Sequence, residues 1–247
     1  MAATASTDPR QLVSLASRIL GDSGAGDLIW GHASMRDPGA RGVWIKQASW
    51  GLEEVTPERV HLVGPAGQVL EGGGPRHSEY PIHTEIMRAR PDVGAVVHTH
   101  SRHAVALGAS GQPLRPVSHE GSYFVPPAVG RFTQTSDLIL TAELGGEVAR
   151  ALGAGTALLL VNHGVVCIGP DLLSATMAAV LLERACQQQL LTQVFGPDYS
   201  WTNETESLAK RAHIYADDTL RQAWNYLVRR LPPLADSPDE NHRHPDK

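Results

Sequence analysis

Two histidines separated by one residue, His98 and His100, end an apolar segment of the sequence. Val96 and Val97 precede them, and valine favours β-strands. Residues i and i+2 of a strand point to the same face with Cβ atoms about 7 Å apart, so the two imidazoles could converge on one cation. An isolated His-x-His pair is more often a strand end with two half-exposed histidines, so further ligands are needed to indicate a metal site.

Two further residues could complete such a site. His163 lies in an expected turn between two apolar segments, where it could equally hydrogen-bond a nearby carbonyl. Glu79 lies in the first turn of an expected helix, where it could equally stabilise the helix dipole. Three imidazoles and one carboxylate would suit zinc, manganese or iron. Whether the four side chains converge depends on the fold.

The N-terminal half is expected to hold two helices with short strands between them. Asp8 can cap the first helix, Pro9 fits its first turn and Gly21 ends it. The other expected elements are strands and turns over residues 27–50, a hairpin over 60–70 that turns at 65–67, and a helix that follows the Gly-rich segment 71–80 and stops before Pro91.

The C-terminal half is expected to combine a long loop, a pair of strands and three helices. Residues 111–135 are rich in Gly, Pro and Ser, which is typical of a functional loop. The segment 156–169 predicts two strands around a turn at 162–164. The expected helices cover residues 136–152, residues 171–195 and a last segment that opens at Asn203, with Glu206 placed for a capping box, and ends before Pro232.

Composition excludes several classes of protein. The 247 residues carry a net charge of −5, and 42% of them are apolar, which indicates a globular chain and not a nucleic-acid-binding protein. No stretch approaches the ~18 apolar residues of a membrane span, and the first residues lack a signal-peptide pattern. We therefore expect a cytoplasmic protein with a small-molecule substrate and two core thiols, Cys167 and Cys186. Residues 1–231 are expected to form one domain and residues 232–247 a polar, disordered tail.

Three segments carry a resemblance to a known family. SEYPIHTEIMRARPDVGAVVHTHSRHAVALG, residues 78–108, resembles the central signature of the class II aldolase/adducin family. LLLVNHGVVCIG, residues 158–169, is similar to its later segment, and GHASMRDP, residues 31–38, is similar to its Gly-Asn-x-Ser loop. The order and spacing of these segments are more specific than any one of them.

The resemblance implies a three-layer α/β/α sandwich with a mainly antiparallel central sheet, usually in a homotetramer with sites between subunits. It implies that His98, His100 and His163 bind one divalent metal ion per subunit. It also implies that Glu79 is a fourth ligand or the acid/base. Tyr123 would belong to a segment that reaches the site of a neighbouring subunit, so Glu79 and Tyr123 are the candidate catalytic residues.

The sequence departs from the sugar-phosphate aldolases of the family in the loops that hold phosphate. Those loops use small polar residues, whereas this chain has His32, Trp50 and His77 there. A phosphate cradle needs small residues and close backbone N–H groups. Arginines and imidazoles suit a planar carboxylate better, although each could also be a solvated surface residue. The candidate substrate-binding residues are His32, Ser34, Arg36, Arg76, His77 and Ser78.

GHASMRDP resembles most closely a decarboxylase branch of the family. Its members act on hydroxylated aromatic or heteroaromatic dicarboxylates, such as dihydroxyphthalate or the hydroxymethylpyridine dicarboxylate of vitamin B6 breakdown. We therefore expect a metal-dependent decarboxylase of a hydroxylated aromatic carboxylate in aromatic catabolism. The first alternative is an aldolase or epimerase acting on a sugar or sugar phosphate. A non-enzymatic adducin-like module and an iron oxygenase are the remaining alternatives.

Overall fold

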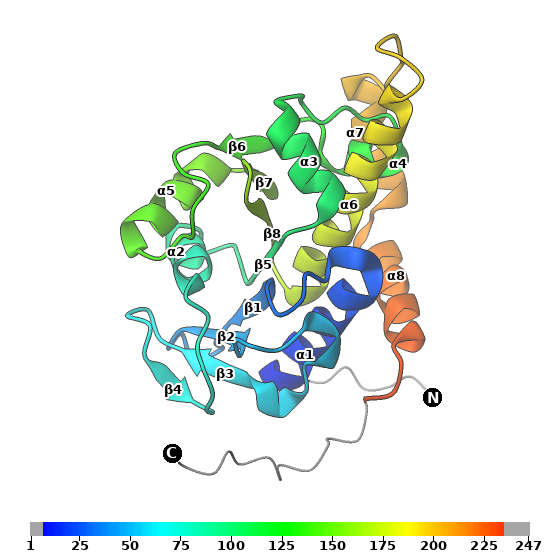
Figure 1. Cartoon of the computed structure of the whole chain (residues 1–247). Coiled ribbons are helices and arrows are strands. Elements are labelled where there is room, and N and C mark those ends of the chain that lie inside the picture. Colours follow the sequence, from blue (N-terminus) through cyan, green and yellow to red (C-terminus); the bar gives the residue numbers. More distant parts are fainter. Residues whose placement is uncertain (1–6, 235–247) are drawn as a thin grey trace.

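Eight strands form one sheet between two layers of helices in the computed structural model, which describes residues 7–234 (Figure 1). The sheet order is β4-β3-β2-β1-β5-β8-β7-β6, and every neighbouring pair is antiparallel except β6 and β7. This confirms the three-layer α/β/α sandwich with a mainly antiparallel sheet. The strands are β1 (His32–Arg36), β2 (Val43–Lys46), β3 (Val60–Val63), β4 (Val69–Glu71), β5 (Ala95–Thr99), β6 (Gly130–Phe132), β7 (Ala157–Leu160) and β8 (Gly164–Gly169).

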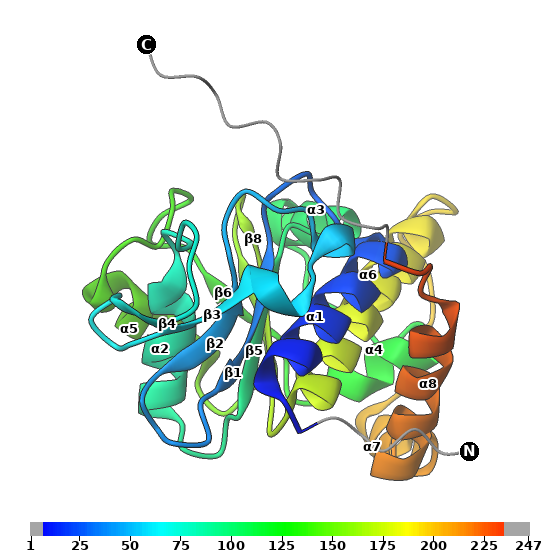
Figure 2. The ribbon, with the colours of Figure 1, turned by 90° about the horizontal axis from the view of Figure 1, so that it is seen from below.

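Helices cover both faces of the sheet. α2 and α5 lie on one face, α1, α3 and α6 lie on the other, and α4, α7 and α8 form an outer group next to α6 (Figures 1 and 2). Short helical turns follow α1 and β2. The helices are α1 (Pro9–Leu20), α2 (Tyr80–Ala89), α3 (Arg102–Ser110), α4 (His119–Phe124), α5 (Ala142–Leu152), α6 (Leu172–Gln193), α7 (Glu204–Ile214) and α8 (Asp217–Arg230).

The two helical layers explain why the central strands are apolar on both sides. Alternate residues of a strand point to opposite faces of the sheet. Val96 of β5 and Val166 of β8 pack in the core with Ile86 of α2. Val97 and Cys167 belong to the opposite core, which α1 and α6 cover. Strands buried on both faces read as continuous apolar runs, as the segments before His98 and after residue 163 do.

Several expected elements are confirmed. Asp8 caps α1 by accepting the N–H of Arg10 at 3.0 Å. Gly67 has a positive φ of 82° in the β3–β4 turn, which glycine adopts without strain. Cys167 and Cys186 are free and buried. These features depend on local sequence or on simple burial, which is why the sequence alone predicts them.

The expected loop over 111–135 is wrong, because the segment contains α4 and β6. Ser118 begins α4 by accepting the N–H of Gly121, and β6 pairs in parallel with β7. The last expected helix is also wrong in extent, since the chain bends at Ala216 and forms two helices, α7 and α8. Asn203 caps the first of them as expected, by accepting the N–H of Glu206.

The expected helix over 136–152 starts later than predicted, at Ala142. Thr141 caps it, and the residues before it run past the start of α2, where the N–H of Ile139 donates to Glu79 Oε1 at 2.8 Å. Glu79 itself is the residue before α2 and not part of its first turn. The single domain over 1–231 stays a prediction, and from residue 235 the expected tail lies outside the described residues.

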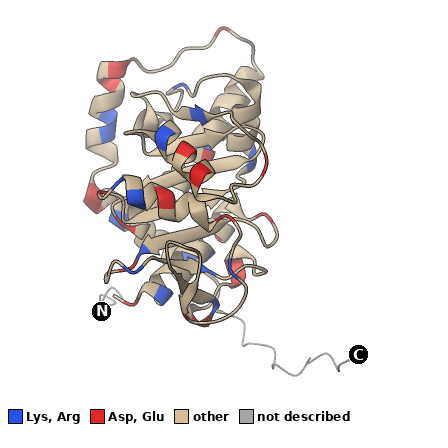
Figure 3. Ribbon diagram, turned by 90° about the vertical axis from the view of Figure 1, so that its left-hand side faces the viewer, with Lys and Arg blue, Asp and Glu red and all other residues tan. Residues whose placement is uncertain are grey.

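The distribution of charged residues and the hydropathy of the helices agree with what the composition predicts. Basic and acidic segments are interspersed on the described part of the face that carries α2 and α5 (Figure 3). Among residues 7–234, none of the helices combines the length and the apolar character that crossing a membrane requires.

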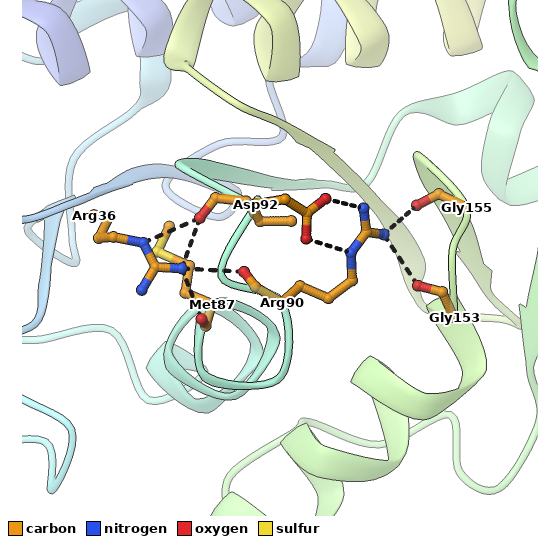
Figure 4. A network of polar contacts seen from close by, with 7 residues as sticks. Arg36, Met87, Arg90, Asp92, Gly153 and Gly155 are labelled. Carbon is orange, nitrogen blue, oxygen red and sulfur yellow. Dashed lines mark hydrogen bonds and ion pairs between the residues drawn. The ribbon is translucent and has the colours of Figure 1, made fainter.

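Arg36, at the end of β1, ties the C-terminal end of α2 to the sheet (Figure 4). Its Nη2 donates to the carbonyls of Met87 at 2.7 Å, Arg90 at 3.1 Å and Val93 at 2.8 Å, and its Nε also donates to Val93. The last carbonyls of a helix have no partners within it and favour a cation. Arg36 therefore caps the end of α2.

The same connection extends to α5 through the side chain of Arg90. Its Nη1 donates to the carbonyls of Gly153 at 3.0 Å and Gly155 at 2.9 Å, just after α5, and Asp92 pairs with the same guanidinium (Figure 4). Two arginines thus fix α2 relative to both β1 and α5. This matters for the site because Glu79 lies at the other end of α2.

We predict that Arg36→Met lowers the free energy of unfolding by about 2–3 kcal/mol, because it removes charged hydrogen bonds to several carbonyls at once. Urea unfolding followed by circular dichroism measures the change. Arg102→Met is the matched control, because Arg102 is exposed in the first turn of α3; we expect a change below about 1 kcal/mol there. Equal stability of the two variants would contradict the capping role.

Candidate metal centre

Four side chains converge where β5 ends beside α2. Glu79, His98, His100 and His163 each offer one ligand atom, and these atoms all lie within 4.8 Å of one another. His98 lies two residues after Val96 and shares its face of the sheet. His100 follows the end of β5, and His163 lies in the turn between β7 and β8. The structure therefore brings together the four residues that the sequence singles out.

Strand pairing and one glycine account for this convergence. β5 and β8 are antiparallel neighbours, with His98 opposite Val166, so the start of β8 lies beside the end of β5. Asn162 adopts a positive φ of 60°, which Asn tolerates better than most residues, and this turns the chain tightly at His163. A Cβ at Gly164 would lie 2.8 Å from His100 and 2.9 Å from His98. Glycine is thus required for both imidazoles to fit.

Neighbouring acceptors orient two of the imidazoles. His98 Nδ1 lies 3.0 Å from the Val165 carbonyl, and His100 Nδ1 lies 2.8 Å from Asp27 Oδ2. Both acceptors require an N–H on Nδ1, so Nε2 is the nitrogen that the neutral form of each ring would offer to a metal ion. Acceptors that bind the other ring nitrogen orient metal-binding histidines in this way in many proteins.

Three of the candidate ligand atoms are buried nitrogens that no described residue satisfies, and this fits a cation. The Nε2 atoms of His98, His100 and His163 have no hydrogen-bond partner among the described residues. The carboxylate of Glu79 lies 3.8 Å from His98 Nε2 and 3.5 Å from His163 Nε2. Buried polar atoms are rarely left unpaired, because desolvation then costs free energy without return. A divalent metal ion would satisfy all three imidazoles and the carboxylate together.

The charge states also suit a metal site. Burial alone would raise the pKa of Glu79, but its contacts with His163, His98 and the Ile139 N–H outweigh burial and lower the pKa to about 2. Burial lowers the pKa of His98 well below its usual value. Glu79 is therefore a carboxylate and His98 a neutral imidazole near pH 7, which are the forms that bind metal.

A second group of histidines lies next to the candidate metal ligands. The ring of His32 lies 5.1 Å from that of His98 and 4.4 Å from that of His77. His32 Nδ1 lies 2.6 Å from His83 Nε2, and Ser34 Oγ lies 2.6 Å from His83 Nδ1. All these residues are buried. Burial lowers the pKa of His83 to about 3, against the opposite effects of Glu79 and the Val96 carbonyl, so His83 is neutral.

Three residues that support this region were not predicted from the sequence. His83 lies four residues after Glu79 in the sequence, and this helical spacing was a signal that could have found it. Asp27 binds His100 from a loop 73 residues away. Lys46 is fully buried, and its Nζ donates to the carbonyls of Ile29 at 3.1 Å and Trp50 at 2.6 Å. A lysine inside an apolar strand was the signal in that case.

The candidate substrate-binding residues differ in burial and in their distance from the candidate metal ligands. His32, Ser34 and His77 are buried near the candidate metal ligands, and Ser78 is exposed beside Glu79. Arg76 is half-buried, donates to the His77 carbonyl at 3.1 Å and lies over the ring of Tyr80 at 4.2 Å.

Arg36 and Tyr123 lie away from the four candidate ligands. Arg36 caps α2, so its guanidinium is engaged in the fold. Tyr123 lines a cavity of about 380 Å³ with Ala157 and Pro170, which lie at the other end of β7 and β8 from His163.

We predict that His98→Ala, His100→Ala and His163→Ala each lower the bound divalent metal, because every variant removes one of four converging ligands. Mass spectrometry of the dialysed protein measures metal per chain. His119→Ala is the matched control, since His119 is exposed at the start of α4. Full metal content in all three variants would show that the cluster binds no metal.

Comparison with known proteins places this geometry in a family. The family model of the class II aldolase and adducin N-terminal domain matches residues 11–190. The chain is 31% identical to a 3,4-dihydroxyphthalate decarboxylase of Arthrobacter keyseri over 192 residues, which covers 70% of this chain and 74% of the relative. It is 30% identical to a 5-methylthioribulose-1-phosphate/5-deoxyribulose-1-phosphate aldolase of Rhodospirillum rubrum over 182 residues, 72% of this chain and 79% of the relative.

A solved structure agrees with this assignment. An aldolase II superfamily protein from Pseudomonas syringae superposes with a TM-score of 0.81 at 25% identity, over 92% of this chain and 94% of that one. The fold, the matched family model and the order of the candidate ligands along the chain are mutually consistent. The chain therefore belongs to the class II aldolase and adducin family.

Proposed function

We propose that the protein is a metal-dependent decarboxylase of a hydroxylated aromatic carboxylate, such as a dihydroxyphthalate, and that it acts in aromatic catabolism. The observation that carries this proposal is the pair of buried imidazoles beside the candidate metal ligands, His32 and His77, whose rings are 4.4 Å apart. A tetrahedral phosphate needs small residues and free backbone N–H groups around it. Two imidazole rings in that place favour a flat ligand.

Apolar side chains beside the metal ligands support an aromatic substrate. The loop that carries Asp27 also carries Leu28 and Trp30, which are 73% and 50% exposed. Asp27 binds His100, so this loop lies at the edge of the site. Exposed apolar groups near a polar centre commonly mark a ligand-binding surface, and an aromatic ring can pack against them.

The reaction needs one proton at the ring carbon that bears the carboxylate. The ortho hydroxyl gives up its proton, the ring carbon gains one, and a β-keto acid results. Its C–C bond then breaks, carbon dioxide leaves, and the electron pair restores the aromatic ring as a phenolate. A bound divalent metal would supply a Lewis acid for the oxygen on which negative charge develops.

Glu79 is the proposed ligand or proton carrier for this step. Its Oε1 is held by the Ile139 N–H, and it is ionised, so it can accept a proton. Arg76 and Ser78 are the proposed partners of a second carboxylate of the substrate. The guanidinium of Arg76 donates one N–H within the protein and has others for a planar anion.

The proposed alternative is an aldolase acting on a sugar phosphate. The relative from Rhodospirillum rubrum that is named as such an aldolase supports it at nearly the same identity as the decarboxylase. Both reactions break a C–C bond and leave negative charge on an oxygen that a metal can stabilise. The two readings therefore differ in the substrate and share the metal ligands.

The proposal includes one zinc, manganese or iron ion per subunit and a cytoplasmic homotetramer. Val194 and Phe195, after α6, are 81% and 94% exposed, and such large apolar side chains are commonly covered by a second subunit. Free buried thiols are compatible with a reducing compartment. In a tetramer, Tyr123 would act only on the site of another subunit, because it lies at the far end of the sheet from its own.

We predict a light-scattering mass of four times 26.5 kDa for the purified protein. Phe195→Asp should lower this mass, because a charge replaces an apolar contact between subunits, whereas Glu143→Gln, an exposed change in α5, should leave it unchanged. A mass of 26.5 kDa for the parent protein at working concentration would refute the tetramer.

We predict that the metal-loaded protein releases carbon dioxide from 3,4-dihydroxyphthalate. Glu79→Gln should lower turnover by about 100-fold or more, because it removes a charged group that binds metal or moves a proton, while the melting temperature stays close to that of the parent. Glu143→Gln serves again as the control. Retro-aldol cleavage of a ketose phosphate, with no carbon dioxide from a panel of hydroxy-aromatic acids, would reject the decarboxylase and support the aldolase.

A further inference from the structure

A hydrogen-bond chain behind the metal ligands decides which nitrogen of His32 carries a proton. The chain runs from Ser34 Oγ to His83 Nδ1 at 2.6 Å, and from His83 Nε2 to His32 Nδ1 at 2.6 Å. The exposed fractions of the three side chains are 0–1%. In a hydrogen bond between two ring nitrogens, one carries a proton and the other does not. Once the donor is known at one end of this hydrogen-bond chain, the donor in each of its hydrogen bonds follows.

The Val96 carbonyl sets that direction, because a carbonyl can only accept. Ser34 Oγ donates to it at 3.4 Å, so the same oxygen can accept an N–H from His83 Nδ1. Burial lowers the pKa of His83 and the Val96 carbonyl raises it, as an acceptor opposite an N–H does. With a proton on Nδ1, neutral His83 has a lone pair on Nε2. His32 must then donate from Nδ1.

We propose that the Ser34–His83 pair holds His32 as its Nδ1–H tautomer, so that His32 Nε2 is a hydrogen-bond acceptor for a hydroxyl group of the substrate. His32 is then a specificity-determining residue, and His83 is a positioning residue that acts through it. The inference rests on the proposed function only for the identity of the ligand. The tautomer itself is a property of the protein.

This assignment changes what His32 can recognise. Carboxylates and phosphates are acceptors near neutral pH, and an acceptor nitrogen gives them no hydrogen bond. A hydroxyl group, in contrast, can donate to it. From the sequence, His32 was expected among the residues that bind a carboxylate. The hydrogen-bond chain instead favours a hydrogen bond from the hydroxyl group ortho to that carboxylate. The ring is well placed for this, because it packs between His98 and His77.

Neutron diffraction from crystals of the zinc-loaded protein tests the tautomer directly. We expect a deuteron on His32 Nδ1 and none on Nε2. In His83→Gln the amide oxygen can still accept from His32, so the tautomer should persist. In His83→Leu the acceptor is lost, and a deuteron should appear on Nε2. A deuteron on His32 Nε2 in the parent protein overturns the proposal, whether or not the variants fold.

Calorimetry with zinc-loaded protein tests the role in binding. The probes are 3,4-dihydroxybenzoate and its two monomethyl ethers, which cannot donate at the methylated oxygen. We expect the ratio of affinities, diol over the more weakly bound ether, to fall about tenfold in His83→Leu and to recover in His83→Gln, with zinc content unchanged. Methylation also affects metal contacts, but that effect is common to all variants and cancels in the comparison.

The two experiments separate the possible failures. If the tautomer is as expected but no aromatic probe binds, the proposed function fails and the tautomer assignment stands. If the probes bind and the ratio is the same in the parent protein and His83→Leu, His83 does not act through His32 and the inference is rejected. An equal loss in His83→Leu and His83→Gln would reject it as well, because only the leucine variant removes the acceptor.

Discussion

Burial of many imidazoles around one carboxylate is the constraint on which the rest of the site depends. Imidazoles removed from water lose much of their affinity for a proton, and the pKa values of His32, His77, His83 and His98 are all lowered by burial. Neutral rings are then held by single hydrogen bonds with a defined direction. Two neighbouring strands of the central sheet position this arrangement, because His98 lies in β5 and His163 directly precedes β8.

The part of the site that sequence could predict is the part encoded locally. His98 and His100 follow from strand periodicity, and His163 follows from a turn between apolar strands. Gly164 also belongs to this local signal, because the close approach of His98 and His100 leaves no space for a Cβ at this position. A strand register and a tight turn are short-range properties, and each is visible within about ten residues of sequence.

The part that sequence missed depends on contacts between distant segments. Asp27 contacts His100 because β1, which follows Asp27, pairs with β5. Lys46 donates to the carbonyls of Ile29 and Trp50 because β2 is buried in the folded chain. The residues before α5 were expected to be helical, yet one hydrogen bond from Ile139 to Glu79, 60 residues apart, helps to hold them along the site. Local propensity gives no information about such a partner.

The two arginines expected at the site also show that contacts between segments, which the sequence does not reveal, decide where a side chain lies. Arg36 and Arg76 both flank motifs that resemble substrate loops, but Arg36 faces unpaired carbonyls at the end of α2, while Arg76 lies over an aromatic ring. The last carbonyls of a helix have no partners within it, so the end of α2 offers the guanidinium of Arg36 several acceptors at once. Decarboxylation and aldol cleavage would both use the four candidate metal ligands, so the residues next to those ligands are the ones expected to distinguish the two reactions. In this chain His32 and His77 are two such residues, and the proposed tautomer of His32 would accept a hydrogen bond from a hydroxyl group and offer none to an anion.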